Sequence, residues 1–168
     1  GLVNLAAAID MADVLRSRYR IDAGLKWPND ILVNDKKICG ILSQMEAEGD
    51  QGAHVNIGLG LNVNNQPETD QPVAVSLKTL LGHPVPRREI LTGFLEVFEA
   101  RMRDFEAPTV IEQWRADNVT LGKTVRVSTV KETVDGKAVD VDANGGLVLQ
   151  LSDGSRRTVV HGDCFHQG

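Results

Sequence analysis

The repeat of apolar residues changes near Leu121 and Gly122, and this change limits the folds that the sequence can adopt. The region just before it has helical spacing, whereas the residues after it alternate between apolar and polar. We therefore predict a boundary between residues 1–120 and a small β-barrel at residues 121–168, and so short a module should need support from the first domain. The predicted barrel strands, separated by Asp-Gly, Asn-Gly-Gly and Asp-Gly turns, are KTVRVST, GKAVDVD, GGLVLQLSD and RRTVVHGD.

The first domain should contain helices at both of its ends. Residues 2–18 have the spacing of an amphipathic helix, residues 86–105 form a longer helix with one apolar stripe, and residues 108–118 form a short one. We expect each apolar stripe to pack in the core. In the first helix the apolar positions are Leu5, Ile9, Ala12 and Leu15, and the opposite face carries Asp10, Asp13 and Ser17.

An antiparallel meander is predicted between these helices. Residues 25–33 are extended, Asn34-Asp35-Lys36 forms a turn, and residues 37–46 return as a second strand. Loops are expected at 48–53 and 64–72. In the third strand, residues 55–64, apolar residues alternate strictly with glycine and asparagine.

One face of the third strand carries no side chain larger than an amide. Glycines within a strand often mark the close approach of another group to the backbone. Two interpretations remain open, namely a floor beneath a ligand and a bulge or tight contact with a neighbouring element. The residues on this face are Asn56, Gly58, Gly60, Asn62 and Asn64.

The segment LKWPNDILV gathers a cation, an indole, an amide and a carboxylate around a proline. Pro28 lacks an amide hydrogen and favours an extended Trp27, so the segment should be stiff. Lys26 lies in this segment and Lys37 begins the returning strand. Two lysines beside a sheet face without bulk suit an anionic ligand such as a nucleoside triphosphate. The alternative is a surface turn with solvated charges.

Several classes of protein are disfavoured. A formal net charge of -5 without a basic stripe argues against nucleic acid as a partner. No apolar run is long enough to cross a membrane and no secretion signal is evident, so we expect a cytoplasmic protein. Cys39 and Cys164 are expected to be buried thiols. The histidines have no metal-site spacing, and GLGLN is neither a P-loop nor a dinucleotide-binding motif.

The blocks KWPNDILVN, KKICGIL and NIGLGLNVN, in this order, resemble the second half of the catalytic domain of biotin protein ligases. The resemblance continues through SLKTLLGHPVPRREIL and IEQWRADNVTLGKTVRV into the last domain, so it covers essentially the whole chain. It implies an α/β (α+β) catalytic domain related to class II synthetases, followed by an SH3-like β-barrel.

The same resemblance implies a two-step reaction. Biotin and MgATP would give biotinyl-AMP, which then acylates a lysine of a biotin carboxyl carrier protein. Lys26 would contact the biotin carboxylate or the anhydride oxygen, and Lys37 would stabilise the phosphoryl charge that develops as pyrophosphate leaves. The other implied contacts are Asn29 and Asp30 with Mg²⁺ and the phosphates, Trp27 as a wall of the adenylate, Gly58, Gly60 and Leu61 beneath biotin, and Asn62 near the nucleotide.

The chain also departs from the family pattern. It lacks the G-R-G-R-x-G-R loop that precedes this region in relatives. It also has Gln44 where relatives often have a glutamate, and Gln167 or Gly168 near the position where many relatives have an arginine. We therefore keep three alternatives to an autonomous ligase: one subunit of a split ligase, a noncatalytic binding fragment, and a lipoate or octanoyl ligase relative. Uncovered sheet edges would favour a homo-oligomer, unless a missing N-terminal half covers them.

Overall fold

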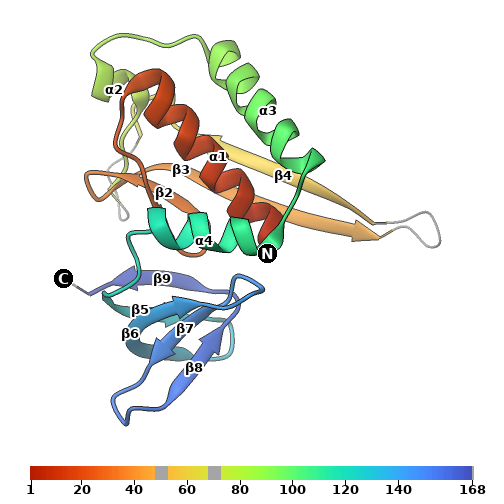
Figure 1. The fold of residues 1–168 in the computed structure, drawn as a ribbon. Helices are drawn as coiled ribbons and strands as arrows, with labels where there is room; N and C mark the ends of the chain where they lie inside the picture. The colour runs from red at the N-terminus through yellow and green to blue at the C-terminus, as the bar shows by residue number, and fades with distance from the viewer. Residues whose placement is uncertain (48–52, 68–72, 168) are drawn as a thin grey trace.

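The computed structural model describes residues 1–47, 53–67 and 73–167, and it contains two antiparallel sheets with helices packed on the first (Figure 1). Parts of the loops expected at 48–53 and 64–72 lie outside the described residues. The elements are α1 (Leu2–Tyr19), β1 (Gly24–Lys26), β2 (Asp30–Val33), β3 (Lys36–Ala47), β4 (Ala53–Leu61), α2 (Leu77–Leu81), α3 (Arg87–Arg103), α4 (Ala107–Asp117), β5 (Thr124–Ser128), β6 (Thr133–Val141), β7 (Leu147–Gln150), β8 (Arg156–Val159) and β9 (Asp163–His166).

Helix α1 is the centre of the first domain, and it is buried on more sides than its amphipathic sequence pattern predicts. Its residues are buried continuously from Leu5 to Ala12, because the first sheet covers one side while α3 and α4 cover others. Asp10, which we expected on a polar face, is completely buried. The run of alanines allows this, because small side chains let neighbouring elements approach the helix from several directions.

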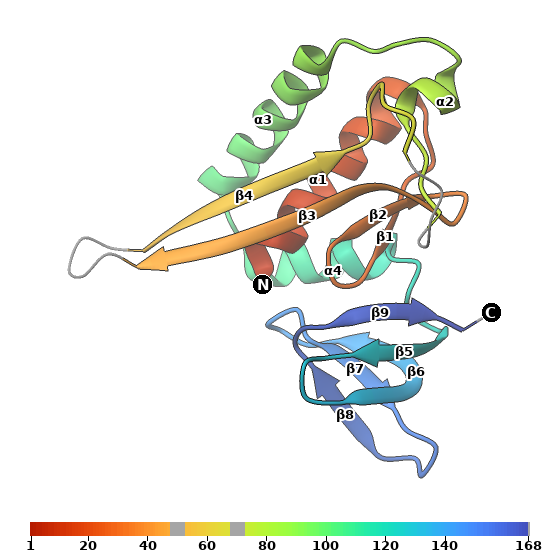
Figure 2. The same cartoon turned by 180° about the vertical axis from the view of Figure 1, so that it is seen from behind.

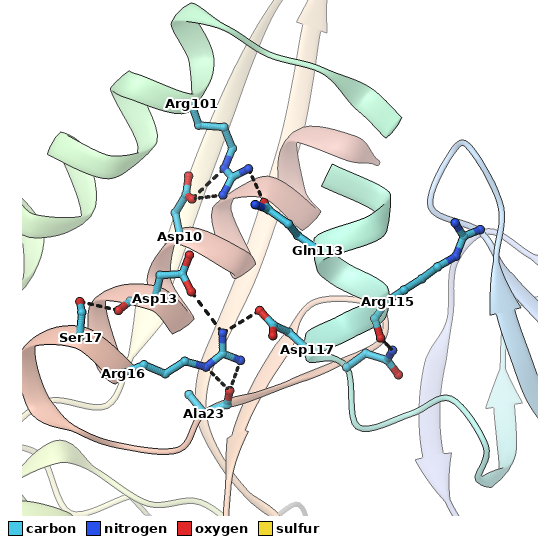
Figure 3. Close-up of polar contacts among 10 residues, drawn as sticks. Asp10, Asp13, Arg16, Ser17, Ala23, Arg101, Gln113, Arg115 and Asp117 are labelled. Carbon is cyan, nitrogen blue, oxygen red and sulfur yellow. Dashed lines mark hydrogen bonds and ion pairs between the residues drawn. The ribbon is translucent and has the colours of Figure 1, made fainter. Parts of the chain in front are cut away.

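Charged side chains join the three helices (Figure 3). The guanidinium of Arg101 in α3 contacts Asp10 Oδ1 at 2.7 Å and also donates to Gln113 of α4. Arg16 of α1 pairs with Asp117 of α4 at 2.7 Å. Burial raises the pKa of the Asp10 carboxyl, and its bond to Arg101 opposes that rise. These contacts hold α1, α3 and α4 against one another.

The first sheet has the order β1-β2-β3-β4 and confirms the predicted antiparallel meander. Asn34 and Asp35 have φ values of 50° and 60°, which suit the tight turn between β2 and β3. The structure corrects one detail. The region from Leu25 to Val33 is two strands rather than one, because the chain turns at Trp27-Pro28-Asn29, where the Trp27–Pro28 peptide bond is cis.

The second sheet has the order β8-β7-β6-β5-β9. Its two outermost strands are not paired with each other in the described part of the chain, so the expected barrel is not seen as a closed one. Two further details differ from the prediction. The Asp135-Gly136 pair lies inside β6 rather than in a turn, and β9, which pairs with β5, was not expected as a separate strand. The segment Asp163–His166 has two adjacent apolar residues between two polar ones, so it lacks the alternation that would reveal a strand.

The second sheet lies against the turn between β1 and β2, with β9 nearest to the first sheet (Figure 2). The indole Nε1 of Trp27 donates to the Gly145 carbonyl at 3.0 Å, and the Trp27 backbone amide donates to Thr120 Oγ1 at 3.1 Å. Arg115 of α4 also pairs with Asp140 of β6. The second domain therefore has the support that its small size requires.

Cys39 and Cys164 are buried free thiols, as predicted. Burial raises the pKa of Cys39 to about 12 and that of Cys164 to about 11. Both remain protonated at neutral pH, which suits packing rather than nucleophilic chemistry. Among the described residues, none of the helices has the length and apolar character needed to span a membrane.

Candidate active site

One row of partner residues crosses all four strands of the first sheet. Lys26 of β1 is opposite Asp30 of β2, Asp30 is opposite Gly40 of β3, and Gly40 is opposite Gly60 of β4. Directly opposed residues in an antiparallel sheet point to the same face. The helices pack on the other face, where Leu25, Ile31 and Cys39 are buried. The row therefore places a lysine and a carboxylate beside two glycines on the face away from the helices.

Lys37 lies on the same face and reaches along it. A bulge between Ile31 and Leu32 brings Lys37 opposite Leu32, and its Nζ contacts Asp30 Oδ1 at 2.6 Å. Gly40 makes room for this ion pair, because a Cβ at that position would lie 3.0 Å from Lys37 Nζ. No sequence pattern singles out Gly40. Its role depends on the side chain of another residue crossing above it.

The glycines of β4 are open, as the ligand-floor interpretation requires. A Cβ added at Gly58 or Gly60 would meet only the backbone carbonyl of the adjacent β3 residue, at 3.6 and 3.4 Å, respectively, among the residues that the structure describes. Both glycines are exposed. Leu61 points to the opposite face, in register with Cys39, and packs against the core. Its side chain is therefore not on the open face with the glycines.

Two adjoining cavities lie between this face and the second sheet. Their volumes are about 550 and 400 Å³, and Lys26, Asp30, Lys37 and Phe165 line both. The structure thus brings both predicted lysines to one crevice. The other residues that line the larger cavity are Leu32, Asp35, Val73, Lys123, Thr124, His166 and Gln167.

The remaining predicted site residues are distributed around this crevice. Trp27 and Asn29 line the smaller cavity, although Trp27 is only 1% exposed and its indole is bonded to the second sheet. Asn62 follows β4 on the glycine face, and its Oδ1 accepts a hydrogen bond from Asn65. Neither cavity is lined by Asn62. The roles implied for these residues stay predictions.

Sequence reasoning missed the contribution of the second domain to this crevice. Lys123 Nζ lies 3.3 Å from His166 Nδ1 and 3.8 Å from Asp35 Oδ1. Burial, with the positive charges of Lys123 and Lys26, lowers the pKa of His166 to about 4. His166 is therefore neutral at pH 7. No local sequence signal identifies this cluster, because it forms only when the two sheets pack together.

Asp30 is the carboxylate in the crevice that best suits a magnesium ion. Mg²⁺ in phosphoryl-transfer sites is usually held by one or two carboxylates together with substrate phosphates and water. The Asp30 side chain is only 14% exposed and faces the cavity that the two lysines line. Within residues 1–47, 53–67 and 73–167 there is no cluster of three or more His, Cys, Asp or Glu side chains arranged for a metal. The residues present fit a phosphate-bound Mg²⁺ rather than a cage made only of protein.

Two protein-family models match the chain. The model described as "Biotin/lipoate A/B protein ligase family" matches residues 2–62, and the one described as "Biotin protein ligase C terminal domain" matches residues 120–167. The first match contains the whole lysine-bearing sheet, and the second contains the sheet that closes the crevice.

The chain is also similar to individual biotin ligases. The chain is 36% identical to the bifunctional ligase/repressor BirA of Bacillus subtilis, over 92% of this chain and 50% of that protein. It is 34% identical to the biotin--[acetyl-CoA-carboxylase] ligase of Mycobacterium tuberculosis, over 99% of this chain and 62% of that protein. The chain thus spans about half to three fifths of these relatives.

The fold also matches a solved structure. The biotin protein ligase of Aquifex aeolicus in complex with biotin and ATP superposes with a TM-score of 0.80 at 23% identity, covering 99% of this chain and 71% of that one. At this identity the match supports the architecture. The two family models and the relatives above show that the chain belongs to the biotin protein ligase family.

Proposed function

We propose that the chain carries the part of a biotin–protein ligase that holds biotin and MgATP, makes biotinyl-AMP and transfers biotin to a lysine of a biotin carboxyl carrier protein. The observation that carries this proposal is that Lys26 and Lys37 line one crevice and lie on the sheet face that also carries the open Gly58 and Gly60, although these glycines line neither cavity. Two anions that repel each other must meet in this reaction, and cations together with an unobstructed floor are what such a site needs.

In the first step a biotin carboxylate oxygen attacks the α-phosphorus of ATP, and pyrophosphate leaves. Lys26 would hold the carboxylate, and Lys37 would stabilise the negative charge on the phosphoryl oxygens. Lys37 is paired with Asp30 in this structure, so its ammonium already lies on the reactive face. When bound, Mg²⁺ would neutralise phosphate charge, and Asp30 with Asn29 would hold it.

In the second step the amine of the carrier lysine attacks the carbonyl carbon of the mixed anhydride, the bond to the phosphate oxygen breaks, and AMP leaves. The neutral amine has to lose a proton as the amide forms. Among the residues that the structure describes, Asp30 and His166 share a cavity with Lys26, and we assign neither of them as the base. We therefore assign the chain a role in orienting the adenylate and in stabilising the leaving phosphate.

Biotin-dependent exchange of pyrophosphate into ATP tests the first step. Exchange by the chain alone would support an autonomous enzyme. No exchange alone, with recovery after a separately produced segment containing G-R-G-R-x-G-R is added, would support a split enzyme. Biotin binding without exchange in either mixture would favour a binding fragment, and no binding of biotin or ATP in either mixture would refute the proposal.

Lipoate or octanoate is the second candidate acyl substrate, since the matching family includes lipoate ligases. The match of residues 120–167 to the C-terminal domain of biotin protein ligases favours biotin. Exchange assays with biotin, lipoate and octanoate in parallel separate the two possibilities. We retain the division into residues 1–120 and 121–168, and a cytoplasmic location, as parts of this proposal.

A further inference from the structure

We propose that Lys123, on the second domain, is a third cation of the polyphosphate site and that His166 positions it. The proposal rests on the proposed function and extends it, because it assigns part of the triphosphate-binding and pyrophosphate-releasing site to the C-terminal domain through two specific side chains. Lys123 immediately precedes β5 and His166 ends β9, and these strands are paired.

The cavity geometry is the first support. Lys123 lines the same 550 Å³ cavity as Lys26 and Lys37, which come from the first sheet. Three lysines from two domains therefore line one open cavity, and a cleft lined by charges of one sign raises the local concentration of a polyanion. The cavity also contains the carboxylates of Asp30 and Asp35, which moderate the mutual repulsion of the lysines while no anion is bound.

The hydrogen bonds of His166 are the second support. Lys123 can only donate, so His166 Nδ1 accepts its bond at 3.3 Å. A neutral imidazole then carries its proton on Nε2, which donates to Thr120 Oγ1 at 3.2 Å. Thr120 is completely buried and also accepts the backbone amide of Trp27. The ring that orients Lys123 is thus anchored to the turn that follows Lys26.

The partner of Lys123 supports the same role. Asp35 lies 3.8 Å from the ammonium, with 86% of its side chain exposed. An exposed pair at this distance is weak, so an arriving phosphate can replace the carboxylate at little cost. His166, by contrast, is an uncharged partner of the ammonium, and both residues line the cavity. Lys123 is oriented without being neutralised by a buried charge.

Titration of the full chain with pyrophosphate, in a calorimeter, tests the proposal. Lys123→Met should weaken pyrophosphate binding by at least tenfold and leave biotin binding within twofold, whereas Lys123→Arg should retain most of the affinity. Lys131→Met is the matched control, because it removes the same charge from an exposed turn of the same domain that lines neither cavity. Equal effects of Lys123→Met and Lys131→Met, or no pyrophosphate binding by the parent chain, would overturn the proposal.

A pair of His166 variants tests its positioning role. His166→Asn retains an acceptor near the position of Nδ1 and should keep pyrophosphate affinity within threefold, whereas His166→Ala should lower it by roughly the same factor as Lys123→Met. Equal affinities in the two variants would remove His166 from the proposal. Pyrophosphate binding that depends on Lys123, together with no binding or activation of biotin in either assay mixture, would refute the proposed function while leaving this inference intact.

Discussion

Two clusters of side chains, each containing both cations and carboxylates, differ in what surrounds them. Between α1, α3 and α4, Arg101 contacts a completely buried Asp10 and the helices close around the pair. Between the two sheets, Lys37 and Lys123 have carboxylate partners but border a cavity of about 550 Å³. The first cluster is buried at Asp10 and nearly so at Arg101, which suits a role in stabilising the fold. The second keeps its cations available to a ligand.

The largest effect on stability is expected from the helical cluster. Arg101→Met leaves the Asp10 carboxylate buried without its cation, which should lower the free energy of unfolding by about 3–5 kcal/mol. Urea denaturation at pH 7 measures the loss. Arg103→Met is the matched control in the same helix, because its pair with Glu99 is 71% and 68% exposed and should contribute less than about 1 kcal/mol. Similar losses in both variants would show that the Asp10 pair has no special role.

The corresponding substitution in the cavity should spare the fold and remove activity. Lys37→Met is expected to reduce biotin-dependent pyrophosphate exchange by about 10²–10³-fold, in the assay mixture that supports exchange, because a preorganised charge at the phosphoryl oxygens is lost. Lys36→Met changes an exposed neighbour and should alter the rate by less than threefold. If exchange persists in Lys37→Met, then Lys37 has no part in adenylation.

A smaller effect is expected when the open floor is filled. Valine favours the strand conformation, so the Gly60→Val chain should fold. Its branched side chain would lie above the sheet where biotin is expected, and biotin affinity should therefore fall roughly tenfold. Gly60→Ala should give an intermediate loss. Calorimetric titration with biotin measures the series. Unchanged affinity in the valine variant would show that biotin lies elsewhere.

The smallest effect concerns pH. His166 has a pKa of about 4 in the folded chain, below its ordinary value of 6.5. As the pH falls from 6.5 to 4, the unfolded state takes up a proton that the folded state does not, so the folded state loses stability in this window. His166→Gln cannot titrate and should show a shallower loss, measured by urea denaturation at several pH values. If the stability of the variant has the same pH dependence as that of the parent chain, then His166 is not the group responsible for the loss.

Local sequence patterns predicted the parts of the site that lie on single elements. Strict alternation in β4 identified the open face of Gly58 and Gly60, and the Asn34-Asp35 turn placed Lys37 on the strand that returns past Asp30. Both predictions depend on residues close together in the chain. The ion pair of Lys37 with Asp30, and the room that Gly40 provides for it, needed the register of the bulged strand pair.

The missed features depend on contacts between distant segments. Asp10 was assigned to a polar face because nothing near it in the sequence reveals Arg101, which lies 91 positions away. Lys123 and His166 were passed over because their place in the crevice is set by the packing of the second sheet on the Trp27 turn. Alternation and turn chemistry describe a strand, but they do not describe which surfaces of two domains meet.

An NMR titration with a non-hydrolysable analogue of biotinyl-AMP tests the contrast between the two clusters most directly. We predict that the backbone amide signals of Lys37, Gly58 and Gly60 shift in a saturable manner, while those of Asp10 and Arg101 stay in place. Saturable shifts at the helical pair without any on the glycine strand, or no saturable shifts at all, would contradict the assignment of the open sheet face as the ligand site.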